Sequence, residues 1–137
     1  MILVKSKLEK ISKSLKRVHK HLLENEKAAV EARVGRTLNP LEFFSMLTQD
    51  ESFAWMKPLS ALMAEIDEFI DENPTITEAD VLGIRDRVDF ILKDPSSKVA
   101  SRYLQYLPQD PDFILAHSEL RDALGPAPKA ATDPSKL

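Results

Sequence analysis

Cysteine is absent from the 137-residue sequence, and glycine occurs only three times. Without cysteine, disulfide bonds, thiolate nucleophiles, iron–sulfur clusters and cysteine-rich zinc sites are all excluded. The sequence also lacks a glycine-rich phosphate-binding loop, a dinucleotide-binding fingerprint and a serine nucleophile elbow. An enzyme with this sequence would have to work without these common catalytic loops.

Long hydrophobic runs are missing as well. The apolar stretches extend over only a few residues, whereas a membrane-spanning helix needs about 20. No apolar segment with a small-residue cleavage site follows the start of the chain. We therefore expect a cytoplasmic protein. The basic, serine-containing start leaves a mitochondrial presequence as an alternative, but the helical pattern continues unbroken past the point where a presequence would be removed.

Strand patterns are missing too, because no segment alternates apolar and polar residues for long enough. Apolar residues instead recur at steps of three and four, most regularly from Val4 through Leu8, Ile11 and Leu15 to Leu22, with Asn25 continuing the pattern. With 43% apolar residues, the chain can form one hydrophobic core. The sequence predicts an all-α, single-domain bundle of about five or six helices over residues 1–124. A flexible Pro/Ala-rich tail is expected at 125–137.

Capping residues set the expected helix boundaries. Gly35 stands where a left-handed C-cap is needed, Asn39-Pro40 with Glu42 forms a complete helix start, and Thr77 precedes Asp80 as a second capping box. The expected helices cover about 5–33, 40–48, 58–72, 77–93, 98–107 and 111–124, with a short turn before the third. In the second helix, Leu41, Phe44 and Leu47 are predicted to face inward.

Charge is distributed unevenly around the net value of −3. Residues 1–21 carry seven bases and one acid, whereas residues 42–89 carry twelve acids and three bases. At about 100° per residue, five bases gather opposite the apolar stripe of the first helix: Lys10, Lys13, Lys16, Arg17 and Lys20. This basic face fits a solvated outer surface, or an anionic surface or nucleic acid. The acidic segment can attract it, within this chain or between chains.

Histidine provides the main candidate for chemistry. His117 falls on the apolar face of the last helix, within reach of Tyr103 or Tyr106 if the last two helices form a hairpin. Together with Trp55, these residues form a candidate ligand pocket. His117 is either a core histidine held by one hydrogen bond, or a general base or pH-sensitive group. His19 and His21 lie about 200° apart on a helix, so they cannot hold one metal ion. We expect no metal site and no cofactor.

Two segments, LEFFSMLTQDESFAWMKPLSAL at 41–62 followed by Ile66-Asp67, and RYLQYLPQDPDFILAHSELR at 102–121, resemble a group of uncharacterised bacterial proteins of similar length. The resemblance covers about half the chain. It implies a bacterial cytoplasmic setting and a shared helical fold, and it assigns no catalytic residue. Pro108 departs from the group's pattern, where a helix-compatible residue is expected, and leaves the end of the fifth helix open.

Three functional hypotheses follow. The leading one is a non-enzymatic helical module that binds another protein or a second copy of itself, given the long apolar seam, the charge asymmetry and the missing catalytic motifs. The alternative is a small-ligand-binding or enzymatic bundle with its pocket near His117. The weaker alternative is binding of an anionic surface or nucleic acid through the basic face, and nucleic acid is not favoured because no aromatic residues or basic turn accompany it.

Overall fold

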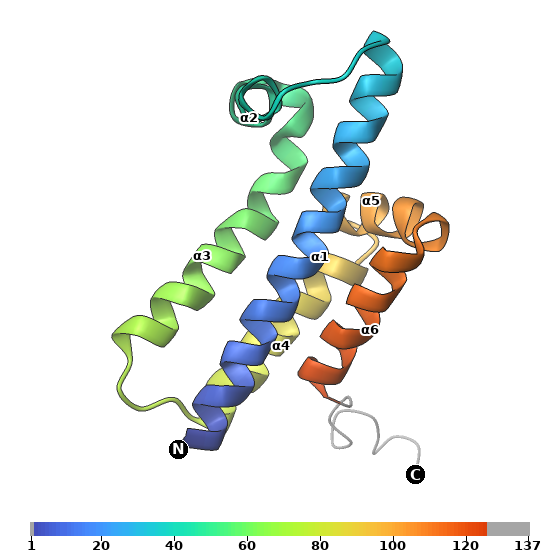
Figure 1. Ribbon diagram of the computed structural model, residues 1–137. Helices are drawn as coiled ribbons and strands as arrows, with labels where there is room; N and C mark the ends of the chain where they lie inside the picture. The colour runs from blue at the N-terminus through green and yellow to red at the C-terminus, as the bar shows by residue number, and fades with distance from the viewer. Residues whose placement is uncertain (1, 126–137) are drawn as a thin grey trace.

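The N-terminal helix is the central element of the fold. In the computed structural model, which describes residues 2–125, α1 covers Ile2–Val34 and lies between α3 and α6, with α4 behind it (Figure 1). Its apolar stripe is fully buried, at Leu8, Ile11, Leu15, Val18 and Leu22. Gly35 ends the helix with a φ of 77°, as the sequence predicts, because only glycine takes this conformation without steric cost.

Five further α-helices and two short 3₁₀ helices follow along the chain: α2 (Pro40–Gln49), η1 (Glu51–Met56), α3 (Lys57–Glu72), α4 (Glu78–Lys93), α5 (Lys98–Tyr106), η2 (Leu107–Gln109) and α6 (Pro111–Leu124). No strand occurs within residues 2–125. The predicted all-α fold class is therefore confirmed. Apart from Gly125, the predicted tail at 125–137 lies outside the described residues, as does Met1.

Side-chain caps fix the starts of the helices. Asn39 accepts a hydrogen bond from the Glu42 amide at 2.9 Å, and the Glu42 carboxylate accepts one from the Asn39 amide at 3.1 Å. Thr77 and Asp80 repeat this reciprocal capping box at the start of α4. Such caps satisfy amide groups that have no partner inside the helix. Both capping boxes agree with the sequence prediction.

Two proline residues mark the start of α3 and the end of α5. Pro58 lies in the first turn of α3, directly after the 3₁₀ helix η1, which is the predicted short turn. Pro108 lies in η2, so α5 ends at Tyr106, one residue earlier than expected. Proline lacks the amide hydrogen that a continuing α-helix needs, and the chain tightens there into a 3₁₀ turn before α6.

The core consists of two clusters that share α1. The larger cluster packs the α1 stripe against α3, α4, α5 and α6, with Leu59 and Leu62 of α3 and Phe113 and Leu120 of α6 almost fully buried. The smaller cluster lies at the other end of α1. It joins Val30, Leu38, Phe43 and Phe53.

The orientation of α2 corrects one sequence prediction. Phe43 is the buried aromatic of this helix, and its ring meets the edge of Phe53 at 6.1 Å between centroids. Leu41 and Phe44, which were expected to face inward, are 80% and 63% exposed, and Leu47 is half-buried. The reason is that Val30, Leu38 and Phe53 lie on the Phe43 side of the helix.

Candidate functional site

His117 lies beside Tyr103, one of the two tyrosines that the sequence analysis left as candidates. The Tyr103 hydroxyl lies 2.7 Å from His117 Nδ1, and the two rings are 5.5 Å apart. Burial raises the pKa of Tyr103 well above its usual value, so the phenol stays protonated. Burial, together with the positive charges of Arg121 and Lys93, lowers the pKa of His117. The pair is therefore a neutral imidazole bonded to a neutral phenol at neutral pH.

Tyr106 contacts a different group, the buried carboxylate of Glu26 on α1, and Trp55 is connected to it through Arg102. The Tyr106 hydroxyl donates to Glu26 Oε1 at 2.6 Å, and Arg102 Nη1 donates to the same carboxylate at 2.9 and 3.2 Å. The Arg102 guanidinium lies over the Trp55 ring, 5.0 Å from its centroid. We call these four residues the Glu26 network. It connects α1, η1 and α5.

The Glu26 network was not expected from the sequence, although one indication of it was present. Glu26 stands four residues after Leu22 and four before Val30, both of which are fully buried. That spacing places all three on one helix face. Glu26 is only 3% exposed and lies at an apolar position, so its buried carboxylate needs the hydrogen-bond partners described above.

The four predicted pocket residues divide between two separate groups of contacts. His117 pairs with Tyr103, whereas Trp55 and Tyr106 belong to the Glu26 network. Four hollows on the described part of the chain are lined by other side chains. A ligand pocket near His117 stays a prediction.

The predicted basic face is partly neutralised by acids of the same chain. Lys16 pairs with Asp67 of α3 at 2.8 Å, and Arg17 pairs with Glu119 of α6. The Lys16 ammonium and the Ser12 hydroxyl lower the pKa of Asp67. The acidic segment thus attracts the basic helix within the molecule, one of the two arrangements expected from the sequence.

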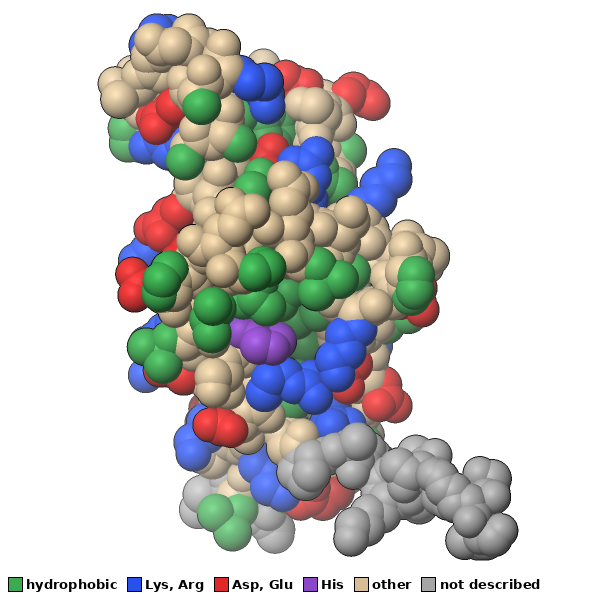
Figure 2. Space-filling model, turned by 90° about the vertical axis from the view of Figure 1, so that its right-hand side faces the viewer, with side chains coloured by type: hydrophobic (Ala, Val, Ile, Leu, Met, Phe, Trp, Pro, Cys, Tyr) green, Lys and Arg blue, Asp and Glu red, His purple; other side chains and the backbone are tan. Residues whose placement is uncertain are grey.

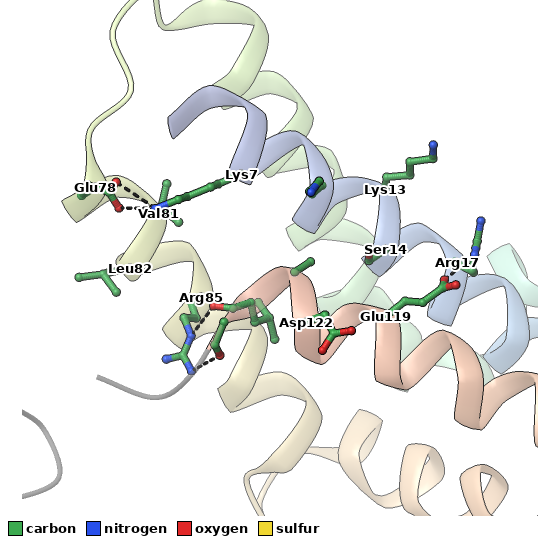
Figure 3. Close-up of a pocket in the computed structure, with 14 residues that line it drawn as sticks. Lys7, Lys13, Ser14, Arg17, Glu78, Val81, Leu82, Arg85, Glu119 and Asp122 are labelled. Atoms are coloured by element: carbon green, nitrogen blue, oxygen red, sulfur yellow. Dashed lines mark hydrogen bonds and ion pairs between the residues drawn. The ribbon is translucent and has the colours of Figure 1, made fainter. Parts of the chain in front are cut away.

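The other three lysines of this face are exposed and have no ion pair within residues 2–125: Lys10, Lys13 and Lys20. Lys10 and Lys13 line the largest of the four hollows, which lies between α1, α4 and α6 and measures about 710 Å³ (Figure 3). At its rim, Lys7 reaches across to Glu78 at 3.1 Å, while Lys13 and Arg17 extend outward from α1. Two apolar side chains of α4 also line the hollow: Val81 is buried and Leu82 is 45% exposed.

Arg85 of α4 forms part of the inner wall of the same hollow, and its burial was not expected from the sequence. Its side chain is only 4% exposed. Nε donates to the Leu124 carbonyl at 2.9 Å and Nη2 to the Gly125 carbonyl at 3.1 Å. Arg85 therefore caps the C-terminus of α6, where the helix dipole favours a cation. Nη1 has only a loose ion pair, 3.9 Å from Asp89 Oδ2.

A second surface feature is apolar and lies over α5 and α6. Leu104 is 62% exposed, Ile114 is 45% exposed and Leu115 is 61% exposed, while Leu107 and His117 are partly exposed. Figure 2 shows hydrophobic side chains near the middle of this side of the molecule, next to a histidine and above a group of lysine and arginine side chains. We call Leu104, Ile114 and Leu115, with the partly exposed Leu107 and His117, the α5–α6 face.

Among residues 2–125, every helix is too short or too polar to span a lipid bilayer. In the same residues, no three or more His, Asp or Glu side chains come together in a group able to hold a metal ion. In comparisons with known proteins, no family model, curated protein or solved structure matches the chain.

Proposed function

We propose that this chain is a non-enzymatic helical module that binds protein, and that its α5–α6 face is the binding surface. In keeping with the resemblance noted in the sequence, the proposed setting is the bacterial cytoplasm. The observation that carries the proposal is the exposure of three large aliphatic side chains, Leu104, Ile114 and Leu115, on two consecutive helices. Apolar side chains that cluster on a surface mark sites where another molecule covers them.

The edge of the face adds charge to this surface. Lys93 and Arg121 pair with Asp89 at 3.8 and 3.0 Å, and Arg85 pairs loosely with the same residue at 3.9 Å, so three cations share one carboxylate. A positive charge is left over beside the apolar side chains. An apolar centre with a polar, charged rim is the usual composition of a protein–protein interface. The partner that this composition favours presents apolar side chains with an acidic edge.

Two double variants test the proposal. Leu104→Gln with Leu115→Gln removes apolar area from the α5–α6 face, and Leu41→Gln with Phe44→Gln makes the same change on the exposed side of α2. In sedimentation velocity over a range of protein and salt concentrations, self-association through the α5–α6 face would give a dimer that only the first variant dissociates. A dimer that dissociates only in the α2 variant would contradict the proposal.

If the wild-type protein is a monomer, the partner is a different protein. A photo-crosslinking amino acid at position 104 should then give a discrete adduct in the cells that express the protein, and the same amino acid at position 41 should not. The adduct should disappear when Leu115→Gln is added. A monomer without an adduct at position 104, or with equal adducts at both positions, would overturn the proposal.

A further inference from the structure

The hydrogen bond between Tyr103 and His117 fixes where the imidazole carries its proton. Tyr103 is only 1% exposed, and its hydroxyl makes no other hydrogen bond to residues 2–125. A buried hydroxyl needs an acceptor for its hydrogen atom, and the acceptor within reach is His117 Nδ1, 2.7 Å away. The neutral imidazole therefore carries its own proton on Nε2.

Protonation of His117 is incompatible with this hydrogen bond. An imidazolium carries hydrogen on both ring nitrogens, so Nδ1 can no longer accept. The Tyr103 hydroxyl would have to turn and accept instead, and its own hydrogen atom would then lack an acceptor in a buried place. A buried donor without a partner is unfavourable. Protonation therefore breaks a contact between α5 and α6.

The charges around His117 oppose its protonation as well. The charged and titratable groups on this side come from α6, α4, α5 and α1: Arg121, Lys93, Asp89, Tyr103 and, stacked on Phe113 next to Tyr103, His21. The two cations repel an imidazolium. Asp89 already pairs with Arg121 and Lys93, at 3.0 and 3.8 Å, so its negative charge is compensated before His117 gains a proton.

Of the two helices that this bond joins, α5 is the one that can move. It has nine residues, and helices shorter than about 12 residues are marginal in water unless they pack against other elements. No other side chain of α5 forms a hydrogen bond to α6 within residues 2–125. In contrast, Phe113 and Leu120 of α6 are fully buried in the larger core cluster, which holds this helix in place.

We propose that the hydrogen bond between Tyr103 and His117 is a pH-sensitive latch that holds α5 on α6. At neutral pH the latch keeps Leu104 of α5 in one surface with Ile114 and Leu115 of α6. Protonation of His117 loosens α5 and divides the α5–α6 face, so that acid weakens binding through it. The use of the latch rests on the proposed binding function, but the latch itself is measured on the isolated protein.

Amide hydrogen exchange of ¹⁵N-labelled protein between about pH 5 and pH 7 measures the opening of each helix, after correction for the intrinsic exchange rate. In the open state, His117 should protonate near its ordinary pKa of about 6.5. Burial, Arg121 and Lys93 hold the pKa of His117 lower in the closed state, so the open state binds more protons. The opening constant of α5 should therefore rise below about pH 6.5, by up to about tenfold per pH unit. The opening constant of α3 should not follow this rise.

Two histidine variants provide the matched comparison. His117→Asn places a side-chain carbonyl where Nδ1 stood, which accepts from Tyr103 but does not titrate, and α5 should then stay protected in acid. His19→Asn changes another partly buried histidine with a lowered pKa, 3.4 Å from Ser60 of α3, and should leave the pH response of α5 unchanged. Tyr103→Phe removes the donor, so α5 should open more at neutral pH and depend less on pH. Circular dichroism melting curves confirm that the variants fold.

The ¹⁵N chemical shifts of the His117 ring provide an independent check, because they distinguish the two neutral tautomers. We expect the proton on Nε2 at neutral pH, and a proton on Nδ1 would overturn the latch. So would the same pH dependence of α5 in the wild type and in His117→Asn, or a rise of equal size in α3, which would indicate general acid unfolding. These measurements need no partner, so a failed latch leaves the crosslinking test at position 104 intact, and a missing adduct leaves the exchange result intact.

Discussion

Tyr106→Phe tests the Glu26 network by removing a single oxygen atom. The Tyr106 hydroxyl is 2.6 Å from Glu26 Oε1, a length typical of a hydrogen bond to a charged carboxylate. Both residues are buried, at 9% and 3% exposure, so water cannot readily replace the lost donor. Arg102 still holds the carboxylate after the substitution. Hydrogen bonds to charged groups contribute about 1.5–3 kcal/mol, and we expect the free energy of unfolding to fall by about 2 kcal/mol.

Urea unfolding followed by tryptophan fluorescence measures this loss directly. Trp55 is the only tryptophan in the sequence, and it lies under Arg102 of the same network. For a urea dependence of about 1–3 kcal/mol per molar, the midpoint should decrease by roughly 1 M while the slope stays constant. Tyr103→Phe, the same change at the other tyrosine, removes a hydrogen bond between neutral groups and should cost only about 1 kcal/mol.

The pH dependence gives a second measurement. Burial and the hydrogen bond to Glu26 raise the pKa of Tyr106 above its ordinary value of about 10. A raised pKa in the folded state contributes stability below pH 10 that is lost as the pH rises through the folded-state pKa. The stability difference between wild type and Tyr106→Phe should therefore shrink above about pH 10. A loss below about 0.5 kcal/mol at neutral pH, or a loss equal to that of Tyr103→Phe, would refute the assigned charge-assisted bond.

Three more predictions concern neighbouring features. Phe43→Ala should destabilise the protein by about 3–4 kcal/mol, because it leaves a cavity in the smaller core cluster. Phe44→Ala, at an exposed position of the same helix, should change stability by less than about 0.5 kcal/mol. Similar losses for the two variants in urea unfolding would contradict the orientation of α2. Arg85→Met should speed amide hydrogen exchange in the last turn of α6 more than in its first turn, because the C-terminal carbonyls lose their cap. An equal increase of exchange along the whole of α6 would contradict the capping role of Arg85. The lowered pKa of Asp67 means that its contribution to stability is present at neutral pH and is lost as the pH falls through the folded-state pKa. In Asp67→Asn, the free energy of unfolding should therefore decrease less steeply at low pH than in the wild type. An unchanged decrease would show that Lys16 and Ser12 do not act through this carboxylate.

The helix boundaries were predictable because local chemistry sets them. A cap such as Asn39 bonds to an amide only three residues away, and Gly35 ends α1 through its own backbone conformation. The α1 stripe was predictable for a related reason, since a long helix repeats its buried positions many times. The expected hairpin of α5 and α6 left Tyr103 and Tyr106 as neighbours of His117, and the structure pairs His117 with Tyr103.

The orientation of α2 was harder to predict from the sequence. Leu41, Phe44 and Leu47 form an apolar stripe, but Phe43 with Leu47 forms another, and ten residues are too few to decide between them. The choice depends on Val30 and Phe53, which are distant in the sequence. Glu26 and Arg85 were not predicted for a similar reason, because a charged residue is buried only where residues distant in the sequence form hydrogen bonds or ion pairs with it.

The sharing of α1 by two hydrophobic clusters constrains the number of residues between them. Leu22 closes the larger cluster and Val30 begins the smaller one, eight residues further along the same continuous helix. Each helical residue turns the chain by about 100° about the helix axis. Deleting one residue between Leu22 and Val30 would therefore rotate the smaller cluster by about 100° relative to the larger cluster. The amino acids on the exposed side of this stretch are free to vary, but their count is not. An insertion or deletion here would separate the two halves of the molecule even though every buried side chain was kept.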